Sequence, residues 1–320
     1  MTRLPRPAKD TPPLADGRVV ASHGRQVEVE DAAGQRIGCR LHGRRLEVVC
    51  GDDVRWGFSA ADRSQGLVYE LKPRRTTLAR LAASGRAEAV VANLTQLVAV
   101  AAPRPVPDWF VIDRYLAGAA WSGIAAVIAF NKAEAGASVE IAAELAVYAA
   151  IGYPIVNTST RGEPGIGALA AHLSAATSVL VGQSGTGKSS LLNLLAPEAR
   201  AVTQEISAAT EEGRHTTTTS VLHRLATGGD LIDSPGVRDY APPLRIMREI
   251  ASGFVELERS AAGCRFQDCL HVSEPGCAVR AAVSAGAIHP RRFESYRRLL
   301  ELARESEARY PDRRPGRPLR

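Results

Sequence analysis

The residues best suited to chemistry form a glycine-rich segment in the middle of the chain. Gly182-Gln183-Ser184-Gly185-Thr186-Gly187-Lys188-Ser189 follows an apolar run and precedes a leucine-rich helical pattern. Glycines at these positions let the backbone wrap phosphate groups so that amide N–H groups point inward, and the lysine reaches the β- and γ-phosphates. The expected Mg²⁺ ligand is Ser189, which is followed by Ser190. The segment predicts a phosphate-binding loop; the alternative is a chance glycine-rich turn.

Two later motifs have the composition needed around a γ-phosphate. Asp233-Ser234-Pro235-Gly236 ends an apolar strand, so its carboxylate can support a magnesium shell and the Gly236 amide can meet the γ-phosphate. The segment Gly213-Arg214-His215-Thr216-Thr217-Thr218-Thr219 has too many hydroxyls to be core. One threonine of Thr216 to Thr218, with Thr217 as the choice, is expected to bind Mg²⁺ when GTP is present. The alternative is a polar loop that runs into a β-branched strand.

A third motif, earlier in the chain, has the composition of a base-reading site. Asn131-Lys132-Ala133-Glu134 follows an apolar strand, where its side chains emerge at the carboxyl end of a parallel sheet. The usual acid at the fourth position is Asp, which accepts two hydrogen bonds from guanine; Glu134 places the carboxylate one methylene further out. Thr158 and Ser159, after the next strand, are the expected second contact. The motif predicts guanine preference, and Asn131-Lys132 opposes the alternative of an ATPase or a small-molecule kinase.

The order of these motifs is that of a circular permutation. The base-reading motif comes first, the phosphate loop follows, and the threonines and Asp233 come last, whereas an ordinary GTPase begins with the phosphate loop. The γ-phosphate side of the site therefore leads directly into the C-terminal region, with Asp233 thirty-one residues before Cys264. We expect that region to sense the nucleotide.

The C-terminal region carries a pattern of metal ligands. Three cysteines and one histidine fall within fourteen residues, at Cys264, Cys269, His271 and Cys277. Three thiolates and one imidazole complete a closed tetrahedral zinc site, which indicates a structural role, because a catalytic site leaves one position open to water. The alternative is a cluster of buried thiols beside a surface histidine.

Composition limits the class of protein. The chain has 320 residues, of which 45% are hydrophobic and 23% charged, as expected for a globular protein of two or three domains. No signal peptide and no apolar run of membrane-spanning length is visible, so we expect a cytoplasmic protein without a membrane partner. The net charge is +6, with an excess of five basic residues in both residues 1–80 and 291–320. Basic ends suit a polyanion such as RNA; the alternative is solvated tails.

Hydrophobic periodicity indicates the elements that must position these residues. Short alternating strands from Asp16 to about Leu71 predict a small β-barrel. Strands and helices then alternate as in a mostly parallel sheet covered on both faces. The last sixty residues combine the Cys/His cluster with a helical pattern from about Pro290 to Arg309.

Together these features resemble one family. The permuted order, the Gly-x-His-Thr-Thr-Thr stretch from Gly213, the Asp233 motif and the Cys-x4-Cys-x-His-x5-Cys spacing are similar to the small-subunit-dependent GTPases called RsgA or YjeQ. The resemblance covers about Asp16 to Ala303. It implies binding to the small ribosomal subunit and its rRNA during late maturation, with GTP hydrolysis stimulated by the subunit. The alternatives are an RNA-binding P-loop nucleotidase elsewhere in RNA metabolism and a non-enzymatic RNA-binding module.

The resemblance also implies a division of the chain. We expect a multidomain protein with a basic flexible tail at 1–15, an OB-fold β-barrel at 16–75, a circularly permuted α/β P-loop GTPase domain at 76–242, a helical zinc-binding domain at 243–309 and a basic tail at 310–320. We also expect a monomer that binds GTP or GDP.

Site roles follow from the same resemblance. It assigns one structural zinc to the Cys/His cluster, phosphate and Mg²⁺ to Lys188 and Ser189, and the positioning of the attacking water to His215, although a solvated histidine has the same sequence signature. Thr217 is the further Mg²⁺ ligand expected from the threonine motif. Intrinsic hydrolysis should be slow because Val237 stands where a water-orienting Gln is usual. The expected nucleotide-binding residues are Asn131, Lys132, Glu134, Thr158, Ser159, Gly182, Gln183, Ser184, Gly185, Thr186, Gly187, Lys188, Ser189, Ser190, Asp233 and Gly236.

Overall fold

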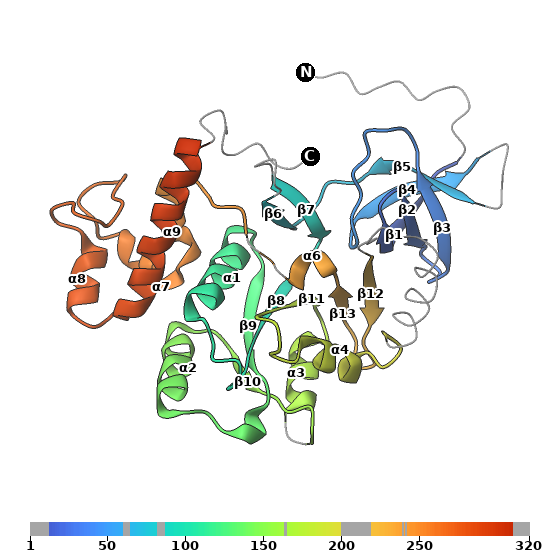
Figure 1. Ribbon diagram of the computed structural model, residues 1–320. Coiled ribbons are helices and arrows are strands. Elements are labelled where there is room, and N and C mark those ends of the chain that lie inside the picture. Colours follow the sequence, from blue (N-terminus) through green and yellow to red (C-terminus); the bar gives the residue numbers. More distant parts are fainter. Residues whose placement is uncertain are drawn as a thin grey trace.

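One continuous sheet runs through most of the molecule (Figure 1). A computed structural model describes residues 13–59, 65–81, 87–162, 165–199, 219–238, 240 and 242–309. In these residues eleven strands pair in the order β10-β9-β8-β11-β13-β12-β1-β2-β3-β5-β4. His215 and Thr217 lie outside the described residues.

The central part is a mostly parallel sheet with helices on both faces. β8, β9, β10, β11 and β13 pair in parallel, and β12 is antiparallel to β13. The strands are β8 Gln96–Ala101, β9 Ala125–Phe130, β10 Ile155–Asn157, β11 Thr177–Val181, β12 Ser220–Arg224 and β13 Asp230–Asp233. The helices are α1 Trp109–Trp121, η1 Ala133–Ala135, α2 Val139–Ile151, α3 Ile166–Leu173, α4 Lys188–Leu195 and α6 Pro235–Arg238.

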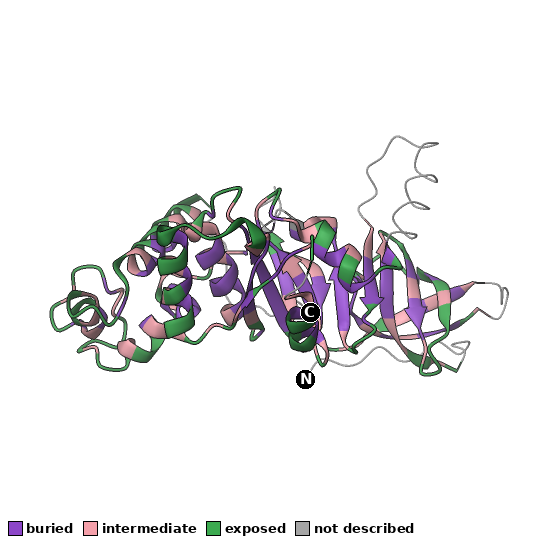
Figure 2. Cartoon of the chain, turned by 90° about the horizontal axis from the view of Figure 1, so that it is seen from below, coloured by how far each residue is buried: buried purple, intermediate pink, exposed green. Residues whose placement is uncertain are grey.

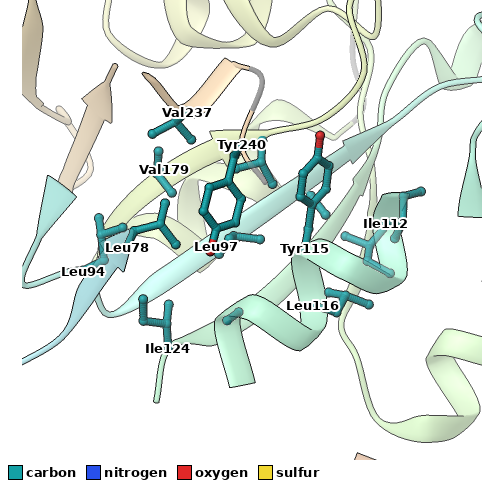
Figure 3. Close-up of a cluster of buried hydrophobic side chains, with 14 of the residues drawn as sticks. Leu78, Leu94, Leu97, Ile112, Tyr115, Leu116, Ile124, Val179, Val237 and Tyr240 are labelled. Atoms are coloured by element: carbon teal, nitrogen blue, oxygen red, sulfur yellow. The ribbon is translucent and has the colours of Figure 1, made fainter. Parts of the chain in front are cut away.

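Alternation along β8 explains the two helical layers. Leu97 and Ala99 pack in the cluster formed with α1 and α2, whereas Val98 and Val100 pack in the cluster formed with α3 and α4. Successive strand residues point to opposite faces, so a strand buried on both faces must be apolar throughout. Figure 2 shows this buried interior along the central strands, and Figure 3 shows the first cluster, where Leu97 lies among side chains of α1. The expected α/β core is therefore confirmed.

The N-terminal strands form a closed five-stranded barrel. They are β1 Ala15–His23, β2 Gln26–Glu30, β3 Arg36–Leu41, β4 Asp53–Phe58 and β5 Gly66–Leu71. Pairing in the order β1-β2-β3-β5-β4, with β1 also pairing β4, closes the barrel in the manner of an OB-fold. Val19, Val29, Val54 and Val68 fill its interior. The expected OB-fold barrel is confirmed.

A hairpin and a strand pair join the barrel to the central sheet. β1 pairs antiparallel with β12, with Ala21 opposite Val221. The hairpin β6 Thr77–Leu81 and β7 Ala87–Ala92 follows the barrel. Val20 and Cys50 of the barrel pack in the same buried cluster as Leu78 of the hairpin. The barrel therefore keeps its own interior cluster and also contributes side chains to the core of the central sheet.

The C-terminal helices pack against α1 on the other side of the molecule (Figure 1). They are η2 Met247–Gly253, α7 Val255–Ala261, α8 Ala278–Ser284 and α9 Pro290–Arg309. Close approach to α1 requires small residues, because a Cβ on Gly253 would lie 2.7 Å from Ala117 Cβ. In the described part of the chain, no helix is both long and apolar enough to span a membrane.

Candidate functional site

The glycine-rich loop lies between the central strand β11 and helix α4. β11 has parallel partners on both sides, so the loop leaves the carboxyl edge at the middle of the sheet. Gly182 has a φ of 150° and Gly187 a φ of 96°. A Cβ on either residue would lie 2.3 Å from a neighbouring atom, Val100 O for Gly182 and Asn131 Nδ2 for Gly187. These two positions of the loop therefore require glycine.

Two lysines lie across the loop. Lys188 Nζ donates to the carbonyls of Gly182 at 2.7 Å and Gln183 at 2.8 Å. Lys132 Nζ donates to the carbonyls of Gly185 at 2.6 Å and Arg104 at 3.0 Å. Phosphate oxygens are stronger acceptors than carbonyls because they are charged. The two lysine ammonium groups therefore give the loop a positive charge that would attract a polyphosphate.

Asn131 joins the base-reading motif to the loop. Its side chain is fully buried, Nδ2 donates to the Thr186 carbonyl at 2.9 Å, and Oδ1 accepts from Thr158 Oγ1 at 3.1 Å. Thr158 N also donates to the Phe130 carbonyl at the end of β9. Three segments far apart in the sequence are therefore joined by the hydrogen bonds of one amide.

Glu134 lies in the turn η1 and is exposed. A hydrogen bond with the Ser159 side chain lowers the pKa of Glu134, with smaller contributions from its own backbone amide and from Arg161. Ser159 is 6% exposed, and its Oγ accepts from Arg161 N at 3.1 Å. The carboxylate is therefore ionised at neutral pH and is oriented by a nearly buried hydroxyl.

Asp233 lies beside the phosphate loop because β13 and β11 are parallel neighbours, with Val179 opposite Ile232. The next residue, Ser234, is 3% exposed and accepts a hydrogen bond from Ser220 Oγ at 2.8 Å. Val237 is 1% exposed and lies in the cluster of Figure 3. Its side chain fixes the turn to the core and cannot orient a water molecule.

The site residues expected from the sequence gather at one edge of the sheet. Except for His215 and Thr217, they lie at or just after the carboxyl ends of β9, β10, β11 and β13. Ser189 is exposed on the first turn of α4, next to Lys188, so its hydroxyl can act as a Mg²⁺ ligand. The roles of His215 and Thr217 stay predictions.

The cysteine and histidine cluster has the geometry of a tetrahedral metal site. The ligand atoms of Cys264, Cys269, His271 and Cys277 all lie within 4.8 Å of one another. Cys264 Sγ and Cys277 Sγ are 4.0 Å apart, and His271 Nδ1 lies 3.5 and 3.4 Å from them. Zinc bonds of about 2.3 Å to sulfur and about 2.0 Å to nitrogen require S···S separations of about 3.8 Å and S···N separations of about 3.5 Å. The donors therefore fit zinc.

Two side chains that the sequence analysis missed shape this loop. The Glu274 carboxylate accepts hydrogen bonds from the backbone N–H groups of Leu270, Val272 and Ser273, at 2.8 to 3.0 Å. Tyr296 of α9 donates its hydroxyl to the Leu270 carbonyl at 2.6 Å. An acid between the last two residues of the Cys/His cluster was the available signal for Glu274, whereas no local pattern indicates Tyr296.

Helix α1 connects the phosphate loop with the C-terminal helices. At its N-terminus, the Asp108 backbone N–H donates to Gln183 Oε1 at 2.9 Å. Further along, the fully buried Asp113 accepts from Arg291 Nη1 at 2.5 Å and Arg292 Nη1 at 2.7 Å, both on α9. One helix therefore contacts both the loop and the C-terminal unit, and sequence patterns did not indicate these contacts.

The Asp113 cluster is a buried ionic network in which every carboxylate faces an arginine. Arg292, itself fully buried, also donates to both carboxylate oxygens of Glu256 at 2.7 and 3.0 Å. Arg291 Nε donates to Glu144 at 2.6 Å, and Tyr148 donates to Asp113 at 2.5 Å. Burial opposes the charged form of Arg292, yet the carboxylates of Asp113 and Glu256 raise its pKa above the usual value. The contact between α1 and the C-terminal helices therefore contains buried charges, and each charge is stabilised by an opposite charge of the same network.

Fold and site together define a class of protein. A parallel sheet presents a phosphate loop, a base-reading motif and an Asp-x-x-Gly turn at one edge, in permuted chain order. The same chain adds an OB-fold barrel and a Cys/His-bearing helical unit. This is the architecture of a circularly permuted P-loop GTPase.

Comparison with known proteins gives the family. The RsgA GTPase family matches residues 71–242. A Chromohalobacter salexigens protein named "Small ribosomal subunit biogenesis GTPase RsgA" is 43% identical over 302 residues, which cover 92% of this chain and 88% of that protein. A protein of the same name from Pseudomonas aeruginosa is 40% identical and covers 93% of this chain and 88% of its own length. The chain belongs to the RsgA GTPase family, as its motifs predicted.

Solved structures agree with this assignment. YjeQ from Thermotoga maritima superposes with a TM-score of 0.71 and 30% identity, covering 91% of this chain and 98% of that one. YloQ, described as a circularly permuted GTPase, superposes with a TM-score of 0.70 over 98% of this chain and all of its own. At 24% identity, YloQ supports the fold alone.

Proposed function

We propose that this chain is a GTP hydrolase that binds the small ribosomal subunit and assists its late maturation, with hydrolysis stimulated by the subunit. The observation that carries the proposal is the joined site, in which the buried Asn131 amide connects the base motif to the phosphate loop of a family member. The name of its relatives, small ribosomal subunit biogenesis GTPase, supplies the ribosomal context.

The roles of the nucleotide-site residues follow from where they lie. Asn131, Lys132, Glu134 and the Thr158–Ser159 segment bind the guanine base, and Ser159 orients the Glu134 carboxylate. The residues of the 182–190 loop wrap the phosphates with backbone amides, and Lys188 exchanges its carbonyl acceptors for phosphate oxygens. The Gly236 amide contacts the γ-phosphate. Hydrolysis then depends on positioning and charge stabilisation.

Two metals are part of the proposal. Ser189, Thr217 and Asp233 would hold Mg²⁺, which when bound neutralises charge on the β- and γ-phosphates. Cys264, Cys269, His271 and Cys277 would hold one structural zinc. His215 positions the attacking water.

Docking on rRNA uses the two outer units. Exposed arginines Arg40, Arg44 and Arg45 lie on the barrel surface, and no ion pair holds them within the described residues. Such side chains neutralise phosphates and release counterions. A cytoplasmic, monomeric protein is consistent with this role.

The deciding experiment is the GTP hydrolysis rate with and without purified small ribosomal subunits. We expect the subunits to stimulate hydrolysis, ATP not to compete with GTP, and Lys188→Ala to abolish turnover while the fold persists. Leu194→Ala, at an exposed position further along the same helix and outside the nucleotide-binding residues, is the control and should keep the parent rate. A rate that stays flat when subunits are added would contradict the proposal and favour an RNA-binding module that uses nucleotide only as a structural ligand.

A further inference from the structure

Hairpin β6–β7 places an arginine beside the turn that meets the γ-phosphate. We propose that Arg80 of this hairpin supplies a positive charge to the γ-phosphate from within the same chain and is a further catalytic residue for GTP hydrolysis. The inference rests on the proposed GTPase function. It adds a residue that lies outside all of the nucleotide-binding motifs.

The hairpin packs directly on the turn. A Cβ built on Gly236 would lie 2.8 Å from Val90 Cγ1 of β7 and 3.8 Å from Arg80 Nη1 of β6. Leu78 of the hairpin is fully buried in the same cluster as Val237, and both are visible in Figure 3. In Figure 1 the hairpin lies next to α6. The backbone of β6 is therefore fixed, and the guanidinium of Arg80 lies beside the glycine whose amide is assigned to the γ-phosphate.

Arg80 forms only a weak ion pair in the structure. Arg80 lies opposite Glu88 in the hairpin, with 3.9 Å between Nη2 and Oε2, and the two side chains are 51% and 54% exposed. An exposed pair of this kind contributes about 0 to 1 kcal/mol. A polyphosphate is a more highly charged acceptor, and the planar guanidinium can bind two of its oxygens at once. Arg80 can therefore exchange Glu88 for the nucleotide at little energetic cost.

A guanidinium beside the γ-phosphate would have a function in GTP hydrolysis. Water attacks the γ-phosphorus, the bond from that phosphorus to the bridging oxygen breaks, and GDP leaves with the bonding electron pair. The proton of the water passes to the released phosphate. Negative charge develops on the bridging and γ-oxygens, where an arginine stabilises the transition state, and the guanidinium stays protonated throughout. Val237 is buried and offers no polar group to this step.

The test compares Arg80→Ala with a matched control. Arg55 on β4 lies opposite Glu70 of β5 at 3.5 Å, and these two side chains are 42% and 57% exposed, so Arg55→Ala removes an equivalent pair far from the turn. Hydrolysis is measured under single turnover, alone and with saturating small subunits. Binding of GDP and of GDP with aluminium fluoride, a transition-state mimic, is measured separately.

We expect Arg80→Ala to lower the hydrolysis rate by about 100-fold or more, and Arg80→Lys to restore only part of it. Aluminium fluoride should no longer strengthen GDP binding to Arg80→Ala, while GDP alone binds as in the parent chain. Arg55→Ala should match the parent in every measurement.

Two results would overturn the inference. One is an unchanged rate and an unchanged aluminium fluoride complex in Arg80→Ala. The other is a defect confined to subunit affinity, with normal hydrolysis at saturation, which would make Arg80 a docking residue. If instead the parent chain hydrolyses GTP without any response to subunits, the ribosomal proposal fails, while the comparison of intrinsic rates still decides the role of Arg80.

Discussion

The two outer units are attached to the central sheet in different ways. The barrel is joined by backbone pairing of β1 with β12 and by apolar packing of Val20 and Cys50 in the core of the central sheet, and Arg18 adds an ion pair to Asp230 at 2.6 Å. The C-terminal helices are joined by side chains, above all Arg291 and Arg292 on the buried Asp113. Backbone pairing does not depend on side-chain identity, whereas a buried ionic network fails when one member is removed. The C-terminal attachment should therefore be much more sensitive to mutation.

This difference bears on how nucleotide binding reaches each unit. The barrel pairs with β12, which begins at Ser220, two residues after the last of the predicted switch threonines, Thr216 to Thr218. The C-terminal unit holds α1, whose first residues contact Gln183 of the phosphate loop. The short tether between Asp233 and Cys264 is thus one of two connections, and α1 is the more direct contact with the loop.

Removal of the proposed zinc should have the largest effect, and only on the unit attached by side chains. Zinc binding contributes about 10 to 16 kcal/mol in zinc-finger peptides. A strong chelator or Cys264→Ser should therefore release the metal and abolish hydrogen-exchange protection in α8 and α9, while β1 and β12 stay protected. Ser273→Ala, in the same loop but outside the ligand set, should keep both the metal and the protection. Loss of protection in β1 would contradict the comparison.

Arg292→Ala is the next largest perturbation. It removes the fully buried cation shared by Asp113 and Glu256. Asp113 keeps Arg291, but Glu256 loses both of its hydrogen bonds to Arg292, so the free energy of unfolding should fall by about 3 to 5 kcal/mol. Chemical denaturation measures this change. Arg297→Ala on the same helix removes an exposed pair with Glu294 and should change stability by about 0.5 kcal/mol or less. Equal effects of the two substitutions would show that the network is not what holds α9.

Arg18→Ala should have the smallest effect of the three. Asp230 keeps Arg224 as a partner at 3.1 Å, and the strand pairing remains, so we expect a loss of about 1 to 2 kcal/mol. Because Arg18 and Arg224 are partly exposed, this loss should shrink in 1 M salt, where the Debye length is about 3 Å. The loss from Arg292→Ala should not shrink. If the loss of stability in Arg18→Ala did not depend on salt, the ion pair at the barrel junction would be as shielded from solvent as the network around Asp113.

Local patterns were sufficient for most of the fold. Strand alternation predicted the barrel, apolar strands between helical stretches predicted the α/β core, and the three nucleotide motifs came together at one sheet edge because parallel strands end on the same side. The Cys/His spacing predicted the cluster for a related reason, since its four residues lie within fourteen positions. In each of these cases the pattern that makes the prediction lies within a short stretch of sequence.

What the sequence by itself determined is therefore the set of chemical groups: a phosphate loop, a base-reading motif, a Cys/His cluster and the permuted order that relates them. Only the tertiary structure decided which distant side chains serve them, because Asp113 meets Arg292 and Arg80 meets Gly236 across more than 150 residues. No hydrophobic periodicity in the sequence indicates a contact between two such distant residues. Burial makes the first of these contacts strong and the packing of a hairpin creates the second, and both depend on the complete chain being folded.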